Sequence, residues 1–315
     1  FNWHVKKEWL IKTPGVVFAI VLAINALTNE GDSVLIQNPV YYPFTEVIID
    51  SNRKLVNNSL VRNGKKYEID FEDFEKKIVD NNVKVFILCN PHNPVGRVWT
   101  KEELEKMGDI CLKHNVVIMD DEIHCDFTYP GFKFTSFMTL DEKYHNSLVL
   151  YTSPSKTFNV AGLQPANIII KNPELRAAYR KANAAAGYSQ GSIMGQVAVK
   201  SVYTKGDEWV NELVEYITGN MNYMRDFVKE NFPKAHFVDP EGTYLTWVDF
   251  SGYGFTDEEL EHIMVEEAHI WLDSGKVFGP ATAQFERFNL ACPRATVVKA
   301  MEQLKAALDN HTKWA

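Results

Sequence analysis

Lys156 follows an apolar run of the sequence after only four intervening residues. The run, residues 147–151, predicts a buried strand, and Thr-Ser-Pro-Ser leads from it to the lysine. A lysine can act as a general base, or bond to a cofactor aldehyde, when burial and neighbouring groups lower its pKa. Most lysines lie on the protein surface instead. The position of Lys156 alone therefore allows both interpretations.

Polar side chains also follow two other predicted strands. The strand predicted at 83–89 is followed by Asn93, and the strand predicted at 115–119 is followed by Asp121 and His124. In open α/β sheets, ligands bind beyond the carboxyl ends of the strands. We therefore expect the asparagine, the aspartate, the histidine and the lysine to converge on one edge of one sheet.

Each of these residues also has an ordinary structural interpretation. Asn93 lies between two prolines and could only form a turn. Asp121 could cap the N-terminus of a helix. Asp120, Glu122 and His124 stand at alternate positions and could bind a metal ion. The sequence shows no further group of metal ligands, so we expect no metal site.

The elements that must position these residues alternate between strands and helices from about residue 13 to residue 172. A helix is expected at 101–113, with Thr100 as its N-cap. The expected strands are 33–37, 83–89, 115–119, 147–151 and 167–170. This alternation predicts an α/β domain whose mostly parallel sheet is covered by helices on both faces.

The pattern changes after Pro173. Helices are expected at 173–203, 207–231, 256–268 and 295–307, with strands at 242–250 and near residues 270 and 288. This predicts a smaller α+β domain. We place a large domain at 1–200 and a small C-terminal domain at 201–315.

Composition excludes several classes of protein. The 315 residues carry a net charge of −8, which argues against a nucleic-acid partner. The longest apolar run, residues 15–25, is too short to span a membrane. The four cysteines show no paired spacing, which favours free thiols in the cytoplasm.

The set of residues matches what pyridoxal phosphate requires of a protein. A lysine must bond to its aldehyde, a carboxylate must keep its ring nitrogen protonated, and an aromatic side chain should stack on its ring. A helix N-terminus should hold its phosphate, and Gly15, otherwise only a tight turn, precedes a predicted helix. The sequence contains no Walker A motif and no GxGxxG after the first strand. It therefore predicts pyridoxal phosphate as the cofactor.

At these positions the sequence resembles fold-type I pyridoxal-phosphate enzymes of the class I/II aminotransferase superfamily, and most closely the MalY/PatB group of cystathionine β-lyases, which includes cystalysin-like C-S lyases. Seven motifs occur in the family's order, at 13–17, 39–44, 91–99, 121–124, 153–159, 241–245 and 287–293. The resemblance implies an aspartate aminotransferase-like fold. In that fold a mostly parallel, seven-stranded sheet forms the large domain, and the smaller C-terminal domain is α+β.

The resemblance also implies a role for each residue around the cofactor ring. Lys156 would form the Schiff base with the cofactor, and Asp121 would pair with the pyridinium nitrogen. Asn93 and His124 would contact the ring hydroxyl. Tyr41 would stack on the ring. Lys156, Asp121 and Tyr41 are thus the implied catalytic residues.

Other implied roles concern the phosphate and the substrate. The backbone N–H groups of Gly15 and Val16 would hold the phosphate, with hydroxyls from Ser153 and Ser155. Arg287 would bind the substrate α-carboxylate, to which its planar guanidinium is suited.

Two departures from the family pattern are visible. Many aminotransferases carry an arginine eight residues after the lysine, where Gln164 stands here. The lyase group commonly lacks that arginine, so Gln164 favours a lyase. Family members also carry several dozen residues before the position of Phe1, including a tyrosine that reaches the neighbouring subunit's site. We therefore expect the sequence to be a piece of a longer chain. Arg287 has an alternative too, an ion pair with Glu286.

The implied function is a carbon–sulfur β-lyase. It would convert cystathionine or cysteine by α,β-elimination to pyruvate, ammonia and a thiol, as a homodimer in the cytoplasm. The first alternative is an aminotransferase that uses the same residues. The second is a non-catalytic regulatory module of the same fold, which would accompany a basic helix-turn-helix domain. No such domain occurs in these residues, and Lys156 and Asp121 favour an enzyme.

Overall fold

The computed structural model describes residues 3–188 and 190–312, and a seven-stranded sheet lies at its centre. The strand order is β1 (Leu10–Pro14), β9 (Pro165–Ile169), β8 (Leu148–Thr152), β7 (Val117–Asp121), β6 (Val83–Cys89), β2 (Ser33–Ile36) and β3 (Lys54–Asn57). The strands from β8 to β3 pair in parallel, whereas β9 is antiparallel to β8 and to β1. The expected mostly parallel sheet is therefore confirmed.

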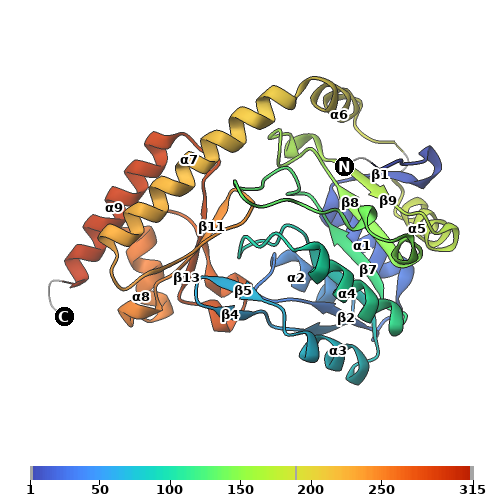
Figure 1. Cartoon of the computed structure of the whole chain (residues 1–315), viewed down its shortest axis with the longest axis horizontal. Coiled ribbons are helices and arrows are strands. Elements are labelled where there is room, and N and C mark those ends of the chain that lie inside the picture. Colours follow the sequence, from blue (N-terminus) through green and yellow to red (C-terminus); the bar gives the residue numbers. More distant parts are fainter. Residues whose placement is uncertain (1–2, 189, 313–315) are drawn as a thin grey trace.

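Helices cover both faces of this sheet (Figure 1). Successive residues of a strand point to opposite faces of the sheet. Val85 and Ile87 of β6 therefore join one apolar cluster, while Phe86 and Leu88 join another. The helices on the first face are α1 (Val16–Leu27), α2 (Pro43–Asp50) and α5 (Pro173–Ala185). Those on the second face are α3 (Phe71–Asp80) and α4 (Lys101–Lys113). Because both faces are buried, β6 is almost continuously apolar.

The sequence pattern predicted one helix correctly and merged two others into one. Helix α4 begins after Thr100, whose hydroxyl accepts the Glu103 N–H in a capping box. The single helix expected at 173–203 is wrong, because the chain forms α5 and then α6 (Ile193–Lys205). The chain leaves α5 at Gly187, which has a φ of +74°, and the Ser192 hydroxyl caps α6.

A second sheet of four antiparallel strands follows in the C-terminal part. Its order is β10 (His236–Val238), β11 (Leu245–Asp249), β13 (Phe285–Asn289) and β12 (Asp273–Ser274). Its helices are α7 (Asp207–Asn231), α8 (Asp257–His262), continued by a π-helical turn at Ile263–Glu267, and α9 (Arg294–Thr312). Their apolar side chains form a third cluster with those of β11 and β13.

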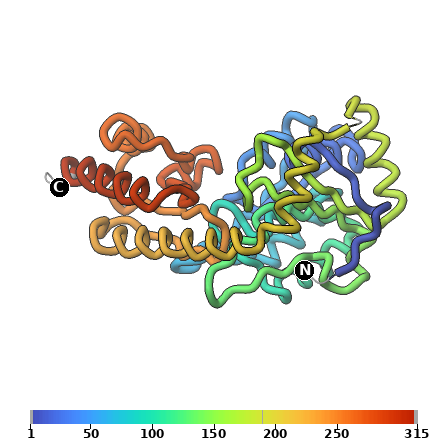
Figure 2. The backbone as a smooth tube through the Cα atoms, turned by 90° about the horizontal axis from the view of Figure 1, so that it is seen from above, coloured from blue at the N-terminus to red at the C-terminus, as the bar shows by residue number. Residues whose placement is uncertain are grey.

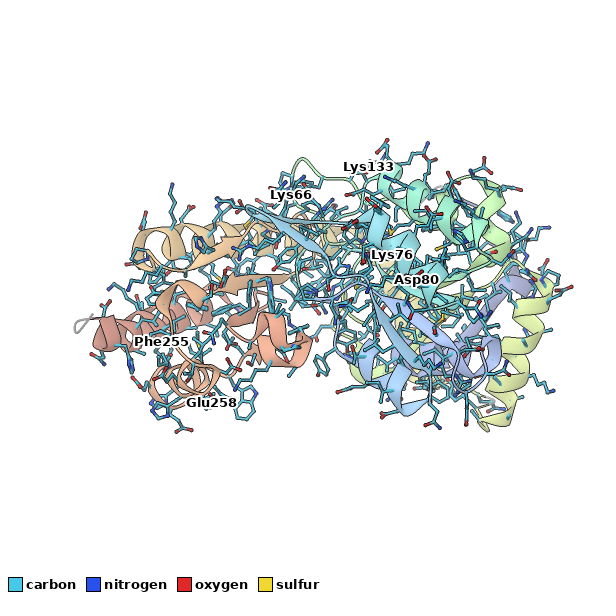
Figure 3. All side chains as sticks on the ribbon, turned by 90° about the horizontal axis from the view of Figure 1, so that it is seen from below. Lys66, Lys76, Asp80, Lys133, Phe255 and Glu258 are labelled. Carbon is cyan, nitrogen blue, oxygen red and sulfur yellow. The ribbon has the colours of Figure 1, made fainter. Side chains whose placement is uncertain are left out.

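We call the seven-stranded sheet with α1 to α5 the large lobe, and the four-stranded sheet with α7, α8 and α9 the small lobe. Figure 2 shows the two lobes side by side, with α7 extending between them. In Figure 3, Phe255 and Glu258 lie on the small lobe and Lys76 and Asp80 on the large lobe. A domain boundary near residue 200 remains a proposal, since α6 crosses that position.

A short hairpin of the large-lobe sequence reaches the small lobe. It consists of β4 (Val61–Asn63) and β5 (Lys66–Glu68), and Lys66 lies between the two groups labelled in Figure 3. Arg62 of the hairpin forms an ion pair with Asp249 of β11. The hairpin therefore contacts the small lobe through this ion pair.

Candidate active site

A cavity of about 520 Å³ lies at the carboxyl ends of β6, β7 and β8. Both sheets contribute to its wall, because residues of β11, β12 and β13 also line it. The cavity is lined by nine of the ten residues expected from the sequence: Gly15, Val16, Tyr41, Asn93, Asp121, His124, Ser155, Lys156 and Arg287. The expected convergence on one sheet edge is therefore present in the structure.

Asp121 is the last residue of β7, and the interpretation as a helix cap is wrong. Its Oδ1 accepts the backbone N–H of Ile123 at 3.1 Å, in a turn that follows the strand. Burial raises the pKa of Asp121 to about 7, although this hydrogen bond and the charge of Lys156 act in the opposite direction. A cationic partner in the cavity would therefore stabilise its ionised form.

Lys156 lies in the turn after β8 and is half-buried in the cavity wall. Burial lowers its pKa, which Asp121 raises and Arg287 lowers further. A lysine in this setting loses its proton more readily than a surface lysine. The surface interpretation of Lys156 is therefore wrong.

Tyr41, His124 and Tyr244 are among the aromatic side chains that line the cavity. Tyr41 follows β2, and burial raises its pKa to about 12, so the hydroxyl stays protonated. His124 is buried, its Nδ1 has no hydrogen-bond partner, and burial lowers its pKa to about 3. The ring of His124 lies 5.3 Å from that of Tyr244. The imidazole is therefore neutral and has a free nitrogen.

The metal-ion interpretation of the alternating residues is not supported by their placement. Among residues 3–188 and 190–312, no group of three or more His, Cys, Asp or Glu side chains could hold a metal ion. His124 lines the cavity, whereas Asp120 and Glu122 are fully buried elsewhere.

Helix α1 directs its N-terminus into the cavity. Gly15 precedes it with a φ of +97°, a conformation that glycine adopts without strain. No side chain caps this end and the first turn contains no acidic residue. The first-turn residues Val16, Val17 and Phe18 line the cavity. Unpaired N–H groups at a helix N-terminus bind anions such as phosphate.

The two serines of the turn after β8 differ in position. Ser155 lines the cavity, but Ser153 does not. The hydroxyl of Ser153 donates to the carbonyl of Pro165 and lies 2.7 Å from the Ser155 hydroxyl. Ser153 therefore contacts the cavity only through Ser155, and its role as a phosphate ligand stays a prediction.

Arg287 reaches the cavity from β13. Its Nη1 donates to Asn93 Oδ1 at 3.0 Å, and its Nη2 pairs with Asp273 of β12. The alternative, an ion pair with Glu286, is wrong because successive residues of β13 face opposite sides of the sheet, and Arg287 pairs with Asp273 instead. Asn93 does lie in a turn, as its two neighbouring prolines suggested, but its buried side chain also faces the cavity.

The polar residues of the cavity wall that sequence reasoning missed include Tyr244 and Asp273. Tyr244 belongs to the motif at 241–245, which could have identified it. Asp273 lies outside every motif, and only the pairing of β12 with β13 brings it to Arg287. Only its contact in the folded chain therefore identifies this aspartate.

The donor set of the cavity fits pyridoxal phosphate. It offers an uncapped helix N-terminus for a phosphate and a buried carboxylate for a ring cation. A half-buried lysine lies in the same wall, and the unpartnered imidazole nitrogen of His124 can meet a ring substituent. Each polar part of the cofactor therefore has a matching group in this chain.

Comparison with known proteins agrees with this geometry. The family model described as aminotransferase class I and II matches residues 2–304. Cystathionine beta-lyase PatB of Bacillus subtilis (strain 168) is 40% identical over 307 residues, which cover 98% of this chain and 79% of PatB.

Two solved structures are similar along almost the whole chain. Cystalysin from Treponema denticola, whose crystal structure contains a pyridoxal 5'-phosphate cofactor, has a TM-score of 0.96 and 38% identity, covering 99% of this chain and 79% of cystalysin. The pyridoxal-phosphate-bound C-S lyase of Staphylococcus hominis, complexed with L-cycloserine, has a TM-score of 0.90 and 32% identity, covering 98% and 76%. The aspartate aminotransferase-like fold expected from the sequence is confirmed. From its family match and its likeness to PatB, the chain belongs to the class I and II aminotransferase family of pyridoxal-phosphate enzymes.

Proposed function

We propose that the protein is a pyridoxal-phosphate-dependent carbon–sulfur β-lyase. It cleaves cystathionine or cysteine by α,β-elimination into pyruvate, ammonia and a thiol, either homocysteine or hydrogen sulfide. The observation that carries this proposal is one cavity holding Lys156, Asp121 and Arg287 beside the N-terminus of α1. The similarity to PatB and to two C-S lyase structures supports the choice of reaction.

Five groups hold the cofactor in this proposal. Lys156 bonds to its aldehyde, Asp121 accepts a hydrogen bond from its ring nitrogen, and Tyr41 stacks on its ring. The N–H groups at Gly15 and Val16 hold its phosphate, as a helix N-terminus does. When bound, the cofactor supplies an electron sink for the charge that develops at the substrate Cα.

Four further side chains complete the binding site. Asn93 and the neutral His124 contact the ring hydroxyl, one as an amide and the other through a free imidazole nitrogen. Ser155 donates a hydroxyl to the phosphate, and Ser153 supports Ser155. All four side chains belong to the large lobe, so one edge of its sheet supplies most of the cofactor contacts.

Proton transfer is assigned to Lys156. The substrate amine would first take the place of Lys156 on the cofactor aldehyde and so free the lysine. Its lowered pKa then allows the freed amine to be neutral, so it can take the proton from Cα as a general base. Arg287 holds the α-carboxylate with its planar guanidinium and so orients the Cα–H bond. The thiolate then leaves from Cβ, and the remaining carbon skeleton hydrolyses to pyruvate and ammonia.

A pyruvate assay tests the proposal. The purified protein is incubated with L-cystathionine and cofactor in the absence of any keto acid. Continuous release of pyruvate is expected. If turnover begins only when a keto acid is added, the protein is an aminotransferase and the lyase proposal is wrong.

Gln164 supports the lyase over the aminotransferase. It lines the cavity at the position where many aminotransferases of the family place an arginine against the phosphate. Its φ of +53° places it at the end of a short 3-10 turn that directly precedes β9. The Gln164→Arg variant therefore adds the aminotransferase side chain at its natural position, and the ratio of transamination to pyruvate release should rise.

Quaternary state and location are further parts of the proposal. A homodimer is supported by the apolar face of α6, where Ile193, Met194 and Val197 are 77%, 66% and 54% exposed. Light scattering should give twice the monomer mass. Across the described part of the chain, no helix has the length and apolarity needed to cross a membrane. All four cysteines are free, which supports a reducing compartment such as the cytoplasm.

A further inference from the structure

Two more carboxyl groups lie beside Asp121 but outside the cavity. Asp120 and Glu122 flank Asp121 in the chain, and both are 0% exposed. In the register of the sheet, Asp120 stands between Leu88 of β6 and Leu150 of β8, and both leucines belong to the second apolar cluster. Asp120 therefore points away from the cavity, into an apolar layer where an ionised carboxylate is costly.

This buried cluster consists of Asp120, Glu122 and Asn90, and it has more acceptor oxygens than hydrogen-bond donors. Four of its side-chain oxygens accept no hydrogen bond: both oxygens of Asp120, Oε2 of Glu122 and Oδ1 of Asn90. Oε1 of Glu122 accepts the Phe137 N–H at 2.9 Å. The amide nitrogen of Asn90 donates to the Thr135 carbonyl at 3.1 Å. The Asn90 amide also interacts with Asp120 and the Ser136 hydroxyl with Glu122, and each lowers the pKa of its partner, but neither lies between the two carboxyls. Ionised carboxylates can only accept, so a hydrogen bond between the two carboxyls requires a proton on one of them.

No cation compensates the two carboxyls. Among the described residues, no lysine, arginine or histidine forms a hydrogen bond or ion pair with Asp120 or Glu122. The titratable groups that they affect are Asp121, Cys89 at the end of β6 and Cys125 in the following turn, none of which is cationic. Burial raises the pKa of Glu122 to about 7 and the pKa of Asp120 well above its usual range. The two carboxyls also act on each other: Glu122 raises the pKa of Asp120, whereas Asp120 lowers the pKa of Glu122, as expected when one proton lies between them.

We propose that Asp120 and Glu122 share one proton at neutral pH, and that the resulting hydrogen bond positions Asp121 for the cofactor nitrogen. The carboxyl O–H of one donates to the carboxylate of the other, so the pair carries one negative charge. Loss of the proton would leave two negative charges and no hydrogen bond between the two carboxyls. The second half of this inference rests on the proposed role of Asp121; the shared proton does not.

The backbone explains how the pair can act on Asp121. The Glu122 N–H donates to the Tyr151 carbonyl at 3.0 Å, and the Asn90 N–H donates to the Asp121 carbonyl at 3.0 Å. Residues 120 to 122 are therefore fixed between the ends of β6 and β8. A repulsion between the two outer carboxyls would displace the turn that carries the middle one. Asp120 and Glu122 are thus positioning residues, since neither lines the cavity.

The Asp120→Asn variant keeps a hydrogen bond between the two side chains but removes the shared proton. Its amide can donate to Glu122 without titrating, so the contact persists at every pH. In infrared spectra of the holoenzyme, the band of a protonated carboxyl should be present in the wild type and lost in the variant. Cofactor affinity should match at about pH 7. As pH rises from about 7 toward 10, wild-type affinity should fall relative to the variant, by up to about tenfold for each pH unit above the point at which the pair loses its proton.

Two further variants complete the test. Glu122→Gln places the donor on the other partner, keeps the acceptor for Phe137, and should reproduce both results if Asp120→Asn does not fold. Glu286→Gln is the matched control: burial raises the pKa of Glu286 to about 8, but this residue lies outside the cavity. It should remove a carboxyl band of its own and leave the pH dependence of cofactor affinity as in the wild type.

The outcomes are distinct. An unchanged carboxyl band in Asp120→Asn and in Glu122→Gln overturns the shared proton. A lost band with wild-type pH dependence of cofactor affinity overturns the positioning role. Failure of the wild type to bind cofactor contradicts the proposed function instead, and it also removes the positioning role, while the infrared result still decides the shared proton.

Discussion

Asn93 Oδ1 accepts a hydrogen bond from Arg287 Nη1 at 3.0 Å, although 194 positions separate the two residues in the chain. Asn93 follows β6 of the large lobe, and Arg287 belongs to β13 of the small lobe. In the proposed function, the first contacts the cofactor ring and the second holds the substrate carboxylate. In that proposal, one hydrogen bond between the lobes therefore joins a residue that binds the cofactor to a residue that binds the substrate.

The variant Arg287→Lys should weaken substrate binding without loss of the cofactor. An ammonium cannot form the paired hydrogen bonds of a guanidinium with a carboxylate. A charged hydrogen bond contributes about 1.5–3 kcal/mol, so KM for cystathionine should rise roughly tenfold to a hundredfold. Steady-state kinetics give KM, and the visible absorbance of bound cofactor reports its retention. Arg294→Lys is the control, because Arg294 contacts Asn220 of α7 and not the cavity. An unchanged KM would contradict the assignment.

The variant Lys156→Ala should lose the visible absorbance of the covalently bound cofactor. Pyruvate formation should fall by about 10²–10⁴-fold or more, the usual contribution of a general base. Lys171→Ala serves as the control, since Lys171 pairs with Glu142 at 3.2 Å outside the cavity. Absorption spectra and pyruvate assays measure both effects. Persistence of the absorbance in Lys156→Ala would mean that another residue bonds to the cofactor.

The variant Asp121→Asn should bind cofactor less tightly and turn over more slowly. An amide cannot keep a ring nitrogen protonated by charge, so the loss of about 1.5–3 kcal/mol from one charged hydrogen bond predicts a tenfold to hundredfold weaker cofactor affinity. The wild-type carboxylate should be needed most above about pH 7, because its pKa without a ring cation is about 7 and it ionises as pH rises through that value. The wild-type and variant affinities should therefore converge as pH falls below about 7, as titration calorimetry can measure. A constant ratio from low to high pH would contradict this role.

Gly96 tests the contact between the lobes. It has a φ of +72°, and a Cβ there would lie 2.6 Å from Pro240 Cβ. The Gly96→Ala variant should destabilise the protein by roughly 1–3 kcal/mol through overpacking, in addition to the strain of a positive φ. Gly254→Ala is the matched control, with a φ of +75° and open space around its Cβ. Denaturant unfolding of both variants isolates the cost of the contact, and equal losses would show that Pro240 can move aside.

The cavity residues beyond β6, β7 and β8 could be predicted because each follows a strand with a strong apolar pattern. Strand β6 is apolar over almost its whole length, and this placed Asn93 just beyond its end. Strands β7 and β8 placed Asp121 and Lys156 in the same way. Chain order alone could not place Arg287, which was assigned through the family motif.

The weaker elements could not be predicted for physical reasons. Strand β1 pairs antiparallel with β9 at the sheet edge, and its burial alternates, so no continuous apolar run marks it. The break between α5 and α6 depends on Gly187, which a helical pattern tolerates until its positive φ is known. Asp273 lies in a strand of only two residues, and its contact with Arg287 is purely tertiary.

The buried pair of Arg97 and Glu241 connects the loop of Asn93 with the small lobe. Arg97 Nε donates to Glu241 at 2.8 Å, and the same carboxylate accepts the Val98 N–H at 2.9 Å. Asn93 lies only four residues before Arg97. In the proposed function, any displacement of the small lobe would therefore act on the loop that carries Asn93, so the substrate side and the cofactor side of the cavity are mechanically linked.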